Sequence, residues 1–360
     1  MPLGVEGFVY GDLYDPAKLS QLHQEFDTRF ASWAPELHAR FRVYRDCRGE
    51  GMSPTDVSDA LLAAAPFVGR FIEELFGVEQ ELAAFRAEVR TSDPVWRFRK
   101  DFVKKRVLRP DAGKAWTRGE AAAALVAKAA LQTTTPVPIG ATTDEELTIA
   151  SAASQLLDLD DVARKAAKAG GAQWTDELRT RARAVRDALA PTAPELGDGP
   201  EDAALGRGVA FALDALEGWL ALRRSRAGDP VRRWPSMRVV RSVDFAHLVE
   251  VERPDRDVPE LIVGPLHERR QRLGFALTDR RMNQREVEQE IDYCMFCHDR
   301  DKDSCSKGLV DSKTGGYKKN PLGVPLAGCP LEEKISEMHA MRQAGELLAA
   351  MALIAVDNPM

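Results

Sequence analysis

Four of the chain's five cysteines lie within 36 residues near the C-terminus, and their spacing is the strongest chemical signal in the sequence. The pattern is Cys294-x2-Cys297-x7-Cys305-x23-Cys329, and Pro330 follows the last cysteine. Two thiolates two residues apart can face one metal from a single tight turn, and a third and a fourth complete a ligand set. An odd number of cysteines in a chain of this length argues against a disulfide framework. The sequence therefore predicts a metal centre held by these four cysteines.

The spacing alone leaves three interpretations of the cysteines open: an iron–sulfur cluster, a structural zinc ion, and unligated thiols. A helix is predicted over 331–341, and Pro330 suits its first position. Cys329 would then lie at a helix N-terminus, where free N–H groups and the helix dipole stabilise a thiolate and an anionic cluster. A run of this spacing that ends in Cys-Pro is typical of an iron–sulfur cluster.

Two histidines accompany the cysteines, and neither is predicted to be a ligand. His298 is expected to be an exposed loop residue, and His339 is expected to be a partly buried packing residue on the following helix. No Ser/His/Asp set and no pair of carboxylates rises above chance, so no catalytic residue is predicted.

The elements that position these residues are predicted to be helices, so the fold class is mainly α. Asp15-Pro16 and Ser53-Pro54 each combine a capping residue with proline in the first turn, and apolar residues recur behind them at helical spacing. Runs over 247–252 and 261–263 suggest one small β-hairpin. Asp93-Pro94 and the capping box Thr117-x-x-Glu120 are each expected to begin a further helix. Other helices are expected to cover 144–168, with a stop at Gly170-Gly171, and then 175–189 and 203–226.

A proline- and glycine-rich stretch and a change in sequence pattern suggest the domain organisation. Residues 1–190 are predicted to form a helical domain of unassigned role, and the proline- and glycine-rich stretch 191–202 to be a linker. Residues 203–255 are expected to be a helix with a connector. Residues 256–360 are expected to be the cluster domain. No nucleotide-binding glycine motif is present.

Composition limits the classes of partner. The chain has 360 residues, with 50 Lys and Arg against 56 Asp and Glu, and the resulting charge of −6 argues against nucleic acid as a partner. The basic run 97–109 is expected to be the solvated face of a packed helix. The longest apolar run, 347–356, is too short for a membrane span. Without a basic and apolar leader at the N-terminus, a cytoplasmic location is expected.

The C-terminal motifs also carry a family resemblance, which covers about residues 273–360. The segments GFALTD, YCMFCHDRDKDSCSKG and CPLEEKISEMH resemble the N-terminal iron–sulfur domain of the glutamate synthase small-subunit and dihydropyrimidine dehydrogenase group. The sequences of these three segments are most similar to those of large bacterial FAD-dependent pyridine nucleotide-disulfide oxidoreductases that begin with this domain. The matching elements are a helix at 286–293, Cys294-x2-Cys297, Cys305, Gly328-Cys329-Pro330-Leu331, Ile335 and Asn358-Pro359.

The resemblance implies a helical, ferredoxin-like iron–sulfur domain with [4Fe–4S] clusters. Carried over, Cys294, Cys297 and Cys305 would serve one cluster and Cys329 a second one, and both would be incomplete within these residues. A flavoprotein domain or subunit would then supply the remaining cysteines and the FAD and NAD(P)H sites. The implied function is electron transfer within a flavin-dependent NAD(P)H oxidoreductase. The alternative is a non-enzymatic helical interaction module with a structural four-cysteine zinc site.

Overall fold

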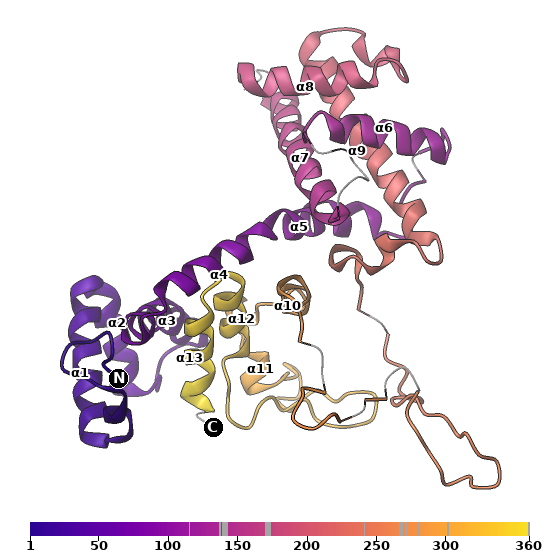
Figure 1. Cartoon of the computed structure of the whole chain (residues 1–360). Helices are drawn as coiled ribbons and strands as arrows, with labels where there is room; N and C mark the ends of the chain where they lie inside the picture. The colour runs from indigo at the N-terminus through magenta and orange to yellow at the C-terminus, as the bar shows by residue number, and fades with distance from the viewer. Residues whose placement is uncertain are drawn as a thin grey trace. The chain divides into compact units, whose positions relative to one another are not determined.

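The computed structural model describes every residue except 115, 137, 139–142, 170–173, 241, 266–268, 271, 279, 280, 301, 359 and 360. The regular structure in the described part of the chain consists of helices (Figure 1), which confirms the predicted mainly α fold. By their contacts the residues form two compact units, one made of 1–90 and 241–360 and the other of 91–240. The boundaries predicted at 190, 203 and 256 differ from the limits of these two units. They stay predictions about which parts of the chain can fold alone.

The first unit begins with a short 3₁₀ turn, η1 (Tyr10–Tyr14), and three helices, α1 (Pro16–Trp33), α2 (Pro35–Cys47) and α3 (Pro54–Phe76). The predicted helix starts are correct. The Asp15 carboxylate accepts the Ala17 N–H at 2.8 Å, and the Ser53 hydroxyl accepts the Asp56 N–H at 3.1 Å. Both caps satisfy a backbone donor that has no partner within the helix.

The apolar stripe of α1 packs on α3 through stacked aromatic rings. Phe30 is fully buried, and its ring lies 4.7 Å from that of Phe67, centroid to centroid. Phe26 meets Phe71 edge to face at 5.4 Å. Leu19, which the pattern also predicts to face inward, is 43% exposed, so the buried stripe of α1 begins at Leu22. Helix α4 (Glu79–Thr91) follows and ends at the first residue of the second unit.

The C-terminal part of the chain returns to α3 and completes the first unit. Its elements are α10 (Gln284–Ile291), η7 (Cys297–Arg300), α11 (Ser304–Lys307), α12 (Ile335–Gln343) and α13 (Leu347–Asp357). Helix α13 lies alongside both α3 and α12 (Figure 1). Leu61 and Ala65 of α3 form one buried cluster with Ala349 and Leu353 of α13.

A glycine permits this close helix crossing. A Cβ at Gly69 would lie 3.2 Å from the backbone nitrogen of Ala349 and 3.6 Å from its Cβ. Nearby, Arg86 of α4 ties the two helices together, since it donates to Glu73 of α3 and to Glu346 at the start of α13. The N-terminal helices and the cysteine-bearing segment therefore share one core.

The second unit consists of helices around α9 (Glu201–Ser225). Its other elements are α5 (Asp93–Phe98), η2 (Arg99–Val107), α6 (Glu120–Gln132), α7 (Glu145–Ala169), α8 (Asp176–Leu189), η3 (Pro194–Gly197), η4 (Pro230–Arg233) and η5 (Pro235–Met237). Phe98, Leu156 and Leu213 are fully buried in its core. The predicted linker 191–202 contributes to this core, because Ala193 and Leu196 are buried in it.

Three local predictions need correction, and two lie outside the described residues. The capping box expected at Thr117 does not form, since α6 begins at Glu120 and its N-cap, Gly119, provides no side-chain hydrogen bond. The helix expected at 331–341 begins at Ile335, because the chain turns after Cys329 and passes through Glu332 at a positive φ of 55°. The hairpin expected near 247–263 forms only one antiparallel bridge, between Glu252 and Val263. The glycine stop at 170–171 and the final proline, 359, fall on residues that the structure does not describe.

No helix in the described ranges is long and apolar enough to cross a membrane.

A larger side chain at Gly69 tests the helix crossing. Gly69→Leu should lower the free energy of unfolding by about 1–3 kcal/mol, because the new side chain meets the α13 backbone in a packed core. Urea titration of the full chain measures this change. Gly11→Leu is the control, since a Cβ there meets nothing within 4 Å. Equal unfolding midpoints for the two variants would contradict the crossing.

Candidate functional site

The turn between Cys294 and Cys297 follows directly from the end of α10. Asn283 caps the start of this helix, and the Asn283 and Glu286 side chains each accept the other residue's backbone N–H. After Ile291 the chain tightens, and the Cys294 N–H donates to the Ile291 carbonyl at 2.8 Å. Phe296 then adopts a left-handed conformation with φ of 47°, which is costly for a residue with a Cβ. This turn folds the Phe296 N–H back onto Cys294 Sγ at 3.4 Å.

A line of polar side chains leads from Cys294 into the interior. Its Sγ lies 3.6 Å from the hydroxyl oxygen of Ser336 in the first turn of α12. The same hydroxyl lies 2.6 Å from Nδ1 of His298, and Nε2 of that ring lies 3.2 Å from the Asp299 carboxylate. Ser336 and His298 are 3% and 4% exposed, whereas Cys294 is half-buried. The chain of contacts therefore joins the half-buried Cys294 to a buried hydroxyl and a buried imidazole.

Cys305 and Cys329 lie together at the base of the loop 308–328. The Cys329 N–H donates to the Cys305 carbonyl at 2.8 Å. Two glycines with positive φ close the loop: a Cβ at Gly308 would lie 2.4 Å from the Leu326 carbonyl oxygen, and one at Gly328 would lie 2.4 Å from the Gly308 nitrogen. Only glycine fits such contacts, so these positions fix how the two cysteines approach each other.

Burial and nearby negative charges disfavour the ionised form of the Cys305 thiol. Burial raises the pKa of Cys305, and the charges of Cys294 and then Cys297 raise it further. A thiolate is disfavoured where water is excluded and other thiolates are near. All five cysteines of the chain are free thiols.

A buried carboxylate lies one residue after Ser336 in α12. Glu337 of α12 is 0% exposed, and one of its oxygens accepts the hydroxyl proton of Ser58 from α3 at 2.5 Å. Its second oxygen has no hydrogen-bond partner in the described part of the chain. The carboxylate of Glu337 also contributes to the raised pKa of Cys305. The Ser58–Glu337 contact therefore connects the first turn of α12, which also carries Ser336, to α3.

Sequence reasoning missed the polar partners of Cys294. The prediction that His298 is an exposed loop residue is wrong, because η7 packs against α3 and α12 and buries the ring. Ser336 carried no signal at all in the sequence, since a serine near a helix start is ordinary. The expected packing role of His339 agrees with its half-buried position in α12.

The predicted metal centre is not supported by this geometry. In the ranges that the structure describes, no three side chains of His, Cys, Asp or Glu are grouped so that they could hold a metal ion. The sulfur of Cys294 instead has Ser336 and a backbone N–H as neighbours, and the imidazole of His298 is engaged on both nitrogens. The prediction of a metal-binding, iron–sulfur protein is therefore corrected.

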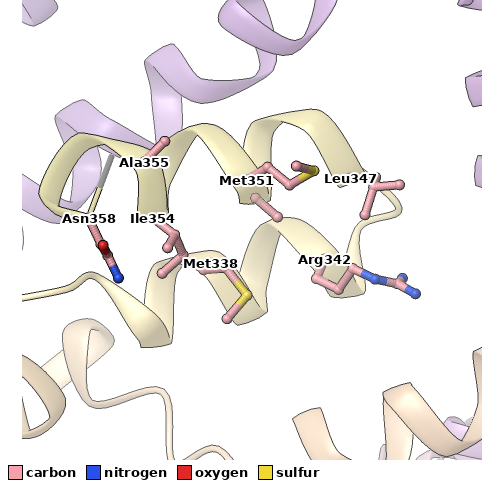
Figure 2. Close-up of a pocket in the computed structure, with 8 residues that line it drawn as sticks. Met338, Arg342, Leu347, Met351, Ile354, Ala355 and Asn358 are labelled. Carbon is pink, nitrogen blue, oxygen red and sulfur yellow. The ribbon is translucent and has the colours of Figure 1, made fainter. Parts of the chain in front are cut away.

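A second feature of the same helices is an apolar groove between α12 and α13 (Figure 2). Its volume is about 400 Å³, and most of the side chains that line it are aliphatic or methionine. Arg342 lies at one end, where its guanidinium is held by Gln284 at 2.5 Å and Glu288 at 3.4 Å from α10. The lining residues are Met338, Arg342, Leu347, Ala350, Met351, Ile354, Ala355 and Asn358.

The basic run 97–109 was expected to be a solvated face, but three of its arginines are engaged within the second unit. Arg97 pairs with Asp158, and Arg106 pairs with Asp214 at 2.8 Å. Arg99 is buried and donates to the backbone carbonyls of Ser236 and Arg238. These cations therefore stabilise the unit's own fold.

Comparison with known proteins finds similarity at the N-terminal end of the chain. A family described as the RP005 N-terminal alpha-helical domain matches residues 3–77, which contain η1, α1, α2 and α3. An uncharacterized protein RP005 of Rickettsia prowazekii (strain Madrid E) is 37% identical over 82 residues, which is 21% of this chain and 28% of that protein. The chain thus spans less than a third of this relative's length. No solved structure matches.

These matches correct the family resemblance inferred from the cysteine motifs. They connect the chain to an uncharacterized α-helical domain and to no iron–sulfur or oxidoreductase family. The motif similarity over 273–360 was therefore misleading, because short Cys-x2-Cys and Cys-Pro patterns constrain few residues. The FAD and NAD(P)H sites expected in other domains or chains stay a prediction.

Removal of the Ser58 hydroxyl tests the buried contact with Glu337. Ser58→Ala should lower the free energy of unfolding by about 1.5–3 kcal/mol, because it leaves a fully buried carboxylate without a donor. Urea titration at neutral pH measures the loss. Ser20→Ala, at an exposed position of α1, is the matched control. A loss in Ser58→Ala no larger than in this control would argue against the contact.

Replacement of His339 should change how stability depends on pH. Burial lowers the pKa of His339 below its usual value, and its Nδ1 has no hydrogen-bond partner in the described residues. The unfolded chain therefore binds more protons than the folded chain as the pH falls, so stability is lost on acidification through the ordinary histidine pKa. His339→Leu should lose less stability than the unchanged chain between about pH 7.5 and 5.5. The two should run parallel above pH 7.5, and identical slopes below it would contradict the prediction.

Proposed function

We propose that this chain is a non-enzymatic helical interaction module whose α12–α13 groove binds an amphipathic helix of a partner protein. The observation that carries the proposal is an apolar groove of about 400 Å³ on a helix pair whose other side is already packed against α3. Helix-in-groove binding places a row of apolar side chains, one turn apart, into such a hollow.

The composition of α13 indicates that a partner covers the groove face of this helix, in addition to α3 on its other face. Its sequence, LLAAMALIAVD, is apolar on all sides, which is typical of a helix that is buried all round. One face, with Ala349 and Leu353, is covered by α3. The groove face carries Met351, which is 61% exposed. Full burial of such a side chain is worth about 1.5–3 kcal/mol.

The neighbouring interface favours a helix as the occupant. One face of α13 is packed on α3 through Ala349, and a neighbouring face lines the groove through Ala350. Met338 and Met351 face the groove from α12 and α13 (Figure 2). Methionine is flexible and polarisable, which suits a surface that receives an apolar partner. The charge of Arg342 is held by α10, so selection would rest on apolar shape.

We also place the module in the cytoplasm. The five free thiols support a reducing compartment, because secreted proteins usually oxidise their cysteines to disulfides.

A model helix and two matched variants test the proposal. The probe is a fluorescent peptide of about 14 residues, roughly four helical turns, with leucine at one-turn spacing and Glu and Lys elsewhere. We expect it to bind the full chain more tightly than a scrambled peptide of the same composition does, as measured by anisotropy. Met351→Glu should weaken binding by about tenfold or more, because a charge replaces a buried contact.

Val356→Glu is the control for this experiment. Val356 lies on the same helix and is 60% exposed, as against 61% for Met351, but it does not line the groove. It should change the affinity less than twofold. Equal effects of the two variants, or equal binding of both peptides, would contradict the proposal. A concentration-dependent dimer that Met351→Glu dissolves, with no peptide binding, would show that a second copy fills the groove.

A further inference from the structure

The segment just before α10 carries large apolar side chains that lie in solvent. Leu273, Phe275 and Leu277 are 65%, 106% and 69% exposed, so Phe275 is fully exposed. Neighbouring apolar side chains on a surface usually mark a site that another surface covers. Residues 273–278, which we call the strap, are therefore expected to have an apolar binding site.

The three large side chains of the strap can lie on one face of it. Its sequence is Leu-Gly-Phe-Ala-Leu-Thr, in which each large residue is followed by a smaller one. Successive side chains of an extended chain point to opposite sides, so the large and the small residues separate onto two faces. One turn bends the strap in the structure, where the Ala276 N–H donates to the Leu273 carbonyl at 3.0 Å. The strap needs to break only this bond to become extended.

The start of α10 holds the strap close to one end of the α12–α13 groove. Gln284 is the first residue of α10, and its side chain accepts a bond at 2.5 Å from Arg342, which lines the groove. Phe275 lies nine residues before Gln284, and an extended chain of that length spans about 30 Å. The groove follows α13, whose 11 residues span about 17 Å. The strap can therefore reach along the whole groove.

Charge favours one direction for the strap in the groove. Arg342 lies at the end beside α10, and Asn358 lies at the opposite end (Figure 2). There the Asn358 amide donates to Glu333 at 2.8 Å, and the exposed Glu332 precedes Glu333 in the chain. Arg272, directly before the strap, is also exposed. A strap that enters from the α10 end brings Arg272 to the glutamates, where opposite charges attract.

We propose that the strap folds onto the α12–α13 groove of its own chain and competes there with a partner helix. The regulatory role rests on the proposed function, whereas the contact between strap and groove does not. Because the two are joined by the chain, the effective concentration of the strap at the groove is of the order of millimolar. A partner has to displace the strap, so its apparent affinity falls with the fraction of molecules whose groove is open. The structure holds the open arrangement.

The methyl signals of Met338 and Met351 test the contact in the full chain without any peptide. Both side chains face the groove (Figure 2), and an aromatic ring beside a methyl group shifts its NMR signal. In protein with isotopically labelled methionine methyl groups, Phe275→Asp should therefore move both signals. Phe245→Asp is the matched control, because Phe245 is also exposed but lies outside the strap, and it should move neither. Unmoved signals in Phe275→Asp, or equal changes in the two variants, would overturn the contact.

Dilution separates the strap of the same chain from that of a second copy. The effect of Phe275→Asp on the methyl signals should not depend on protein concentration, because the strap and the groove are joined. An effect that disappears on dilution would overturn the intramolecular contact and would place the strap in the groove of a second copy.

The leucine-bearing model peptide tests the competition. Phe275→Asp should tighten its binding to the full chain by about threefold or more, because the groove is then open in more of the molecules. Phe245→Asp should change the affinity less than about twofold. Equal affinities in these two variants would overturn the competition. Methyl signals that move while the peptide binds neither variant would support the contact of the strap and contradict the proposed function.

Reversal of one charge tests the direction of the strap. Arg272→Glu should move the signals of Met338 and Met351 towards their positions in Phe275→Asp, because it places like charges together at the far end of the groove. The difference from the unchanged chain should vanish near 1 M salt, where the Debye length is about 3 Å. Arg253→Glu, at an exposed arginine outside the strap, is the control and should have no effect. Equal effects of the two reversals, or an effect that persists at 1 M salt, would overturn this direction.

Discussion

The contact between α3 and α13 is the constraint on which the rest of the first unit depends. At Gly69 the two helices approach so closely that a single added carbon atom would lie 3.2 Å from the α13 backbone. This crossing joins segments that are about 280 residues apart in the chain, and it buries Leu61 and Leu353 in one cluster. The helices that resemble the RP005 N-terminal domain therefore provide the surface on which the cysteine-bearing segment folds.

The same crossing explains why a polar layer can exist in this core. An isolated buried carboxylate is expensive, because it loses its water without compensation. Ser58 of α3 provides one donor to Glu337, and the first turn of α12 brings Ser336 to His298 and Cys294. The first turn of α12 thus contacts both Ser58 of α3 and Cys294. A substitution on α3 that shifts α12 should therefore alter the surroundings of Cys294.

Helix α12 also joins the turn at Cys294 to the groove. Its first turn contacts Cys294 through Ser336, and Met338 and Arg342 in its later turns line the groove. Ionic contacts hold both ends of this region in place. Lys334, just before α12, pairs with Asp303 beside the thiols, and Arg342 pairs with Glu288 of α10. Partly buried pairs of this kind fix orientation more than they add stability.

The sequence by itself determined the helices, because their start signals are local. Asp15-Pro16 and Ser53-Pro54 place a side-chain acceptor and a proline within one turn, and no distant residue is needed to interpret them. The mainly α fold follows from these signals and from the helical apolar spacing. The cysteine spacing was just as visible, but it led to a family resemblance and a metal centre that the comparisons and the geometry correct.

Only the tertiary structure decided the surroundings of the thiols. His298 looked exposed in the sequence because its neighbours are charged, yet η7 packs it between α3 and α12. Ser336 and Ser58 were unremarkable serines until the helix crossing placed them on Cys294 and Glu337. The physical reason is that burial and hydrogen bonding between segments 42 and 279 residues apart depend on packing, and no local pattern encodes that packing.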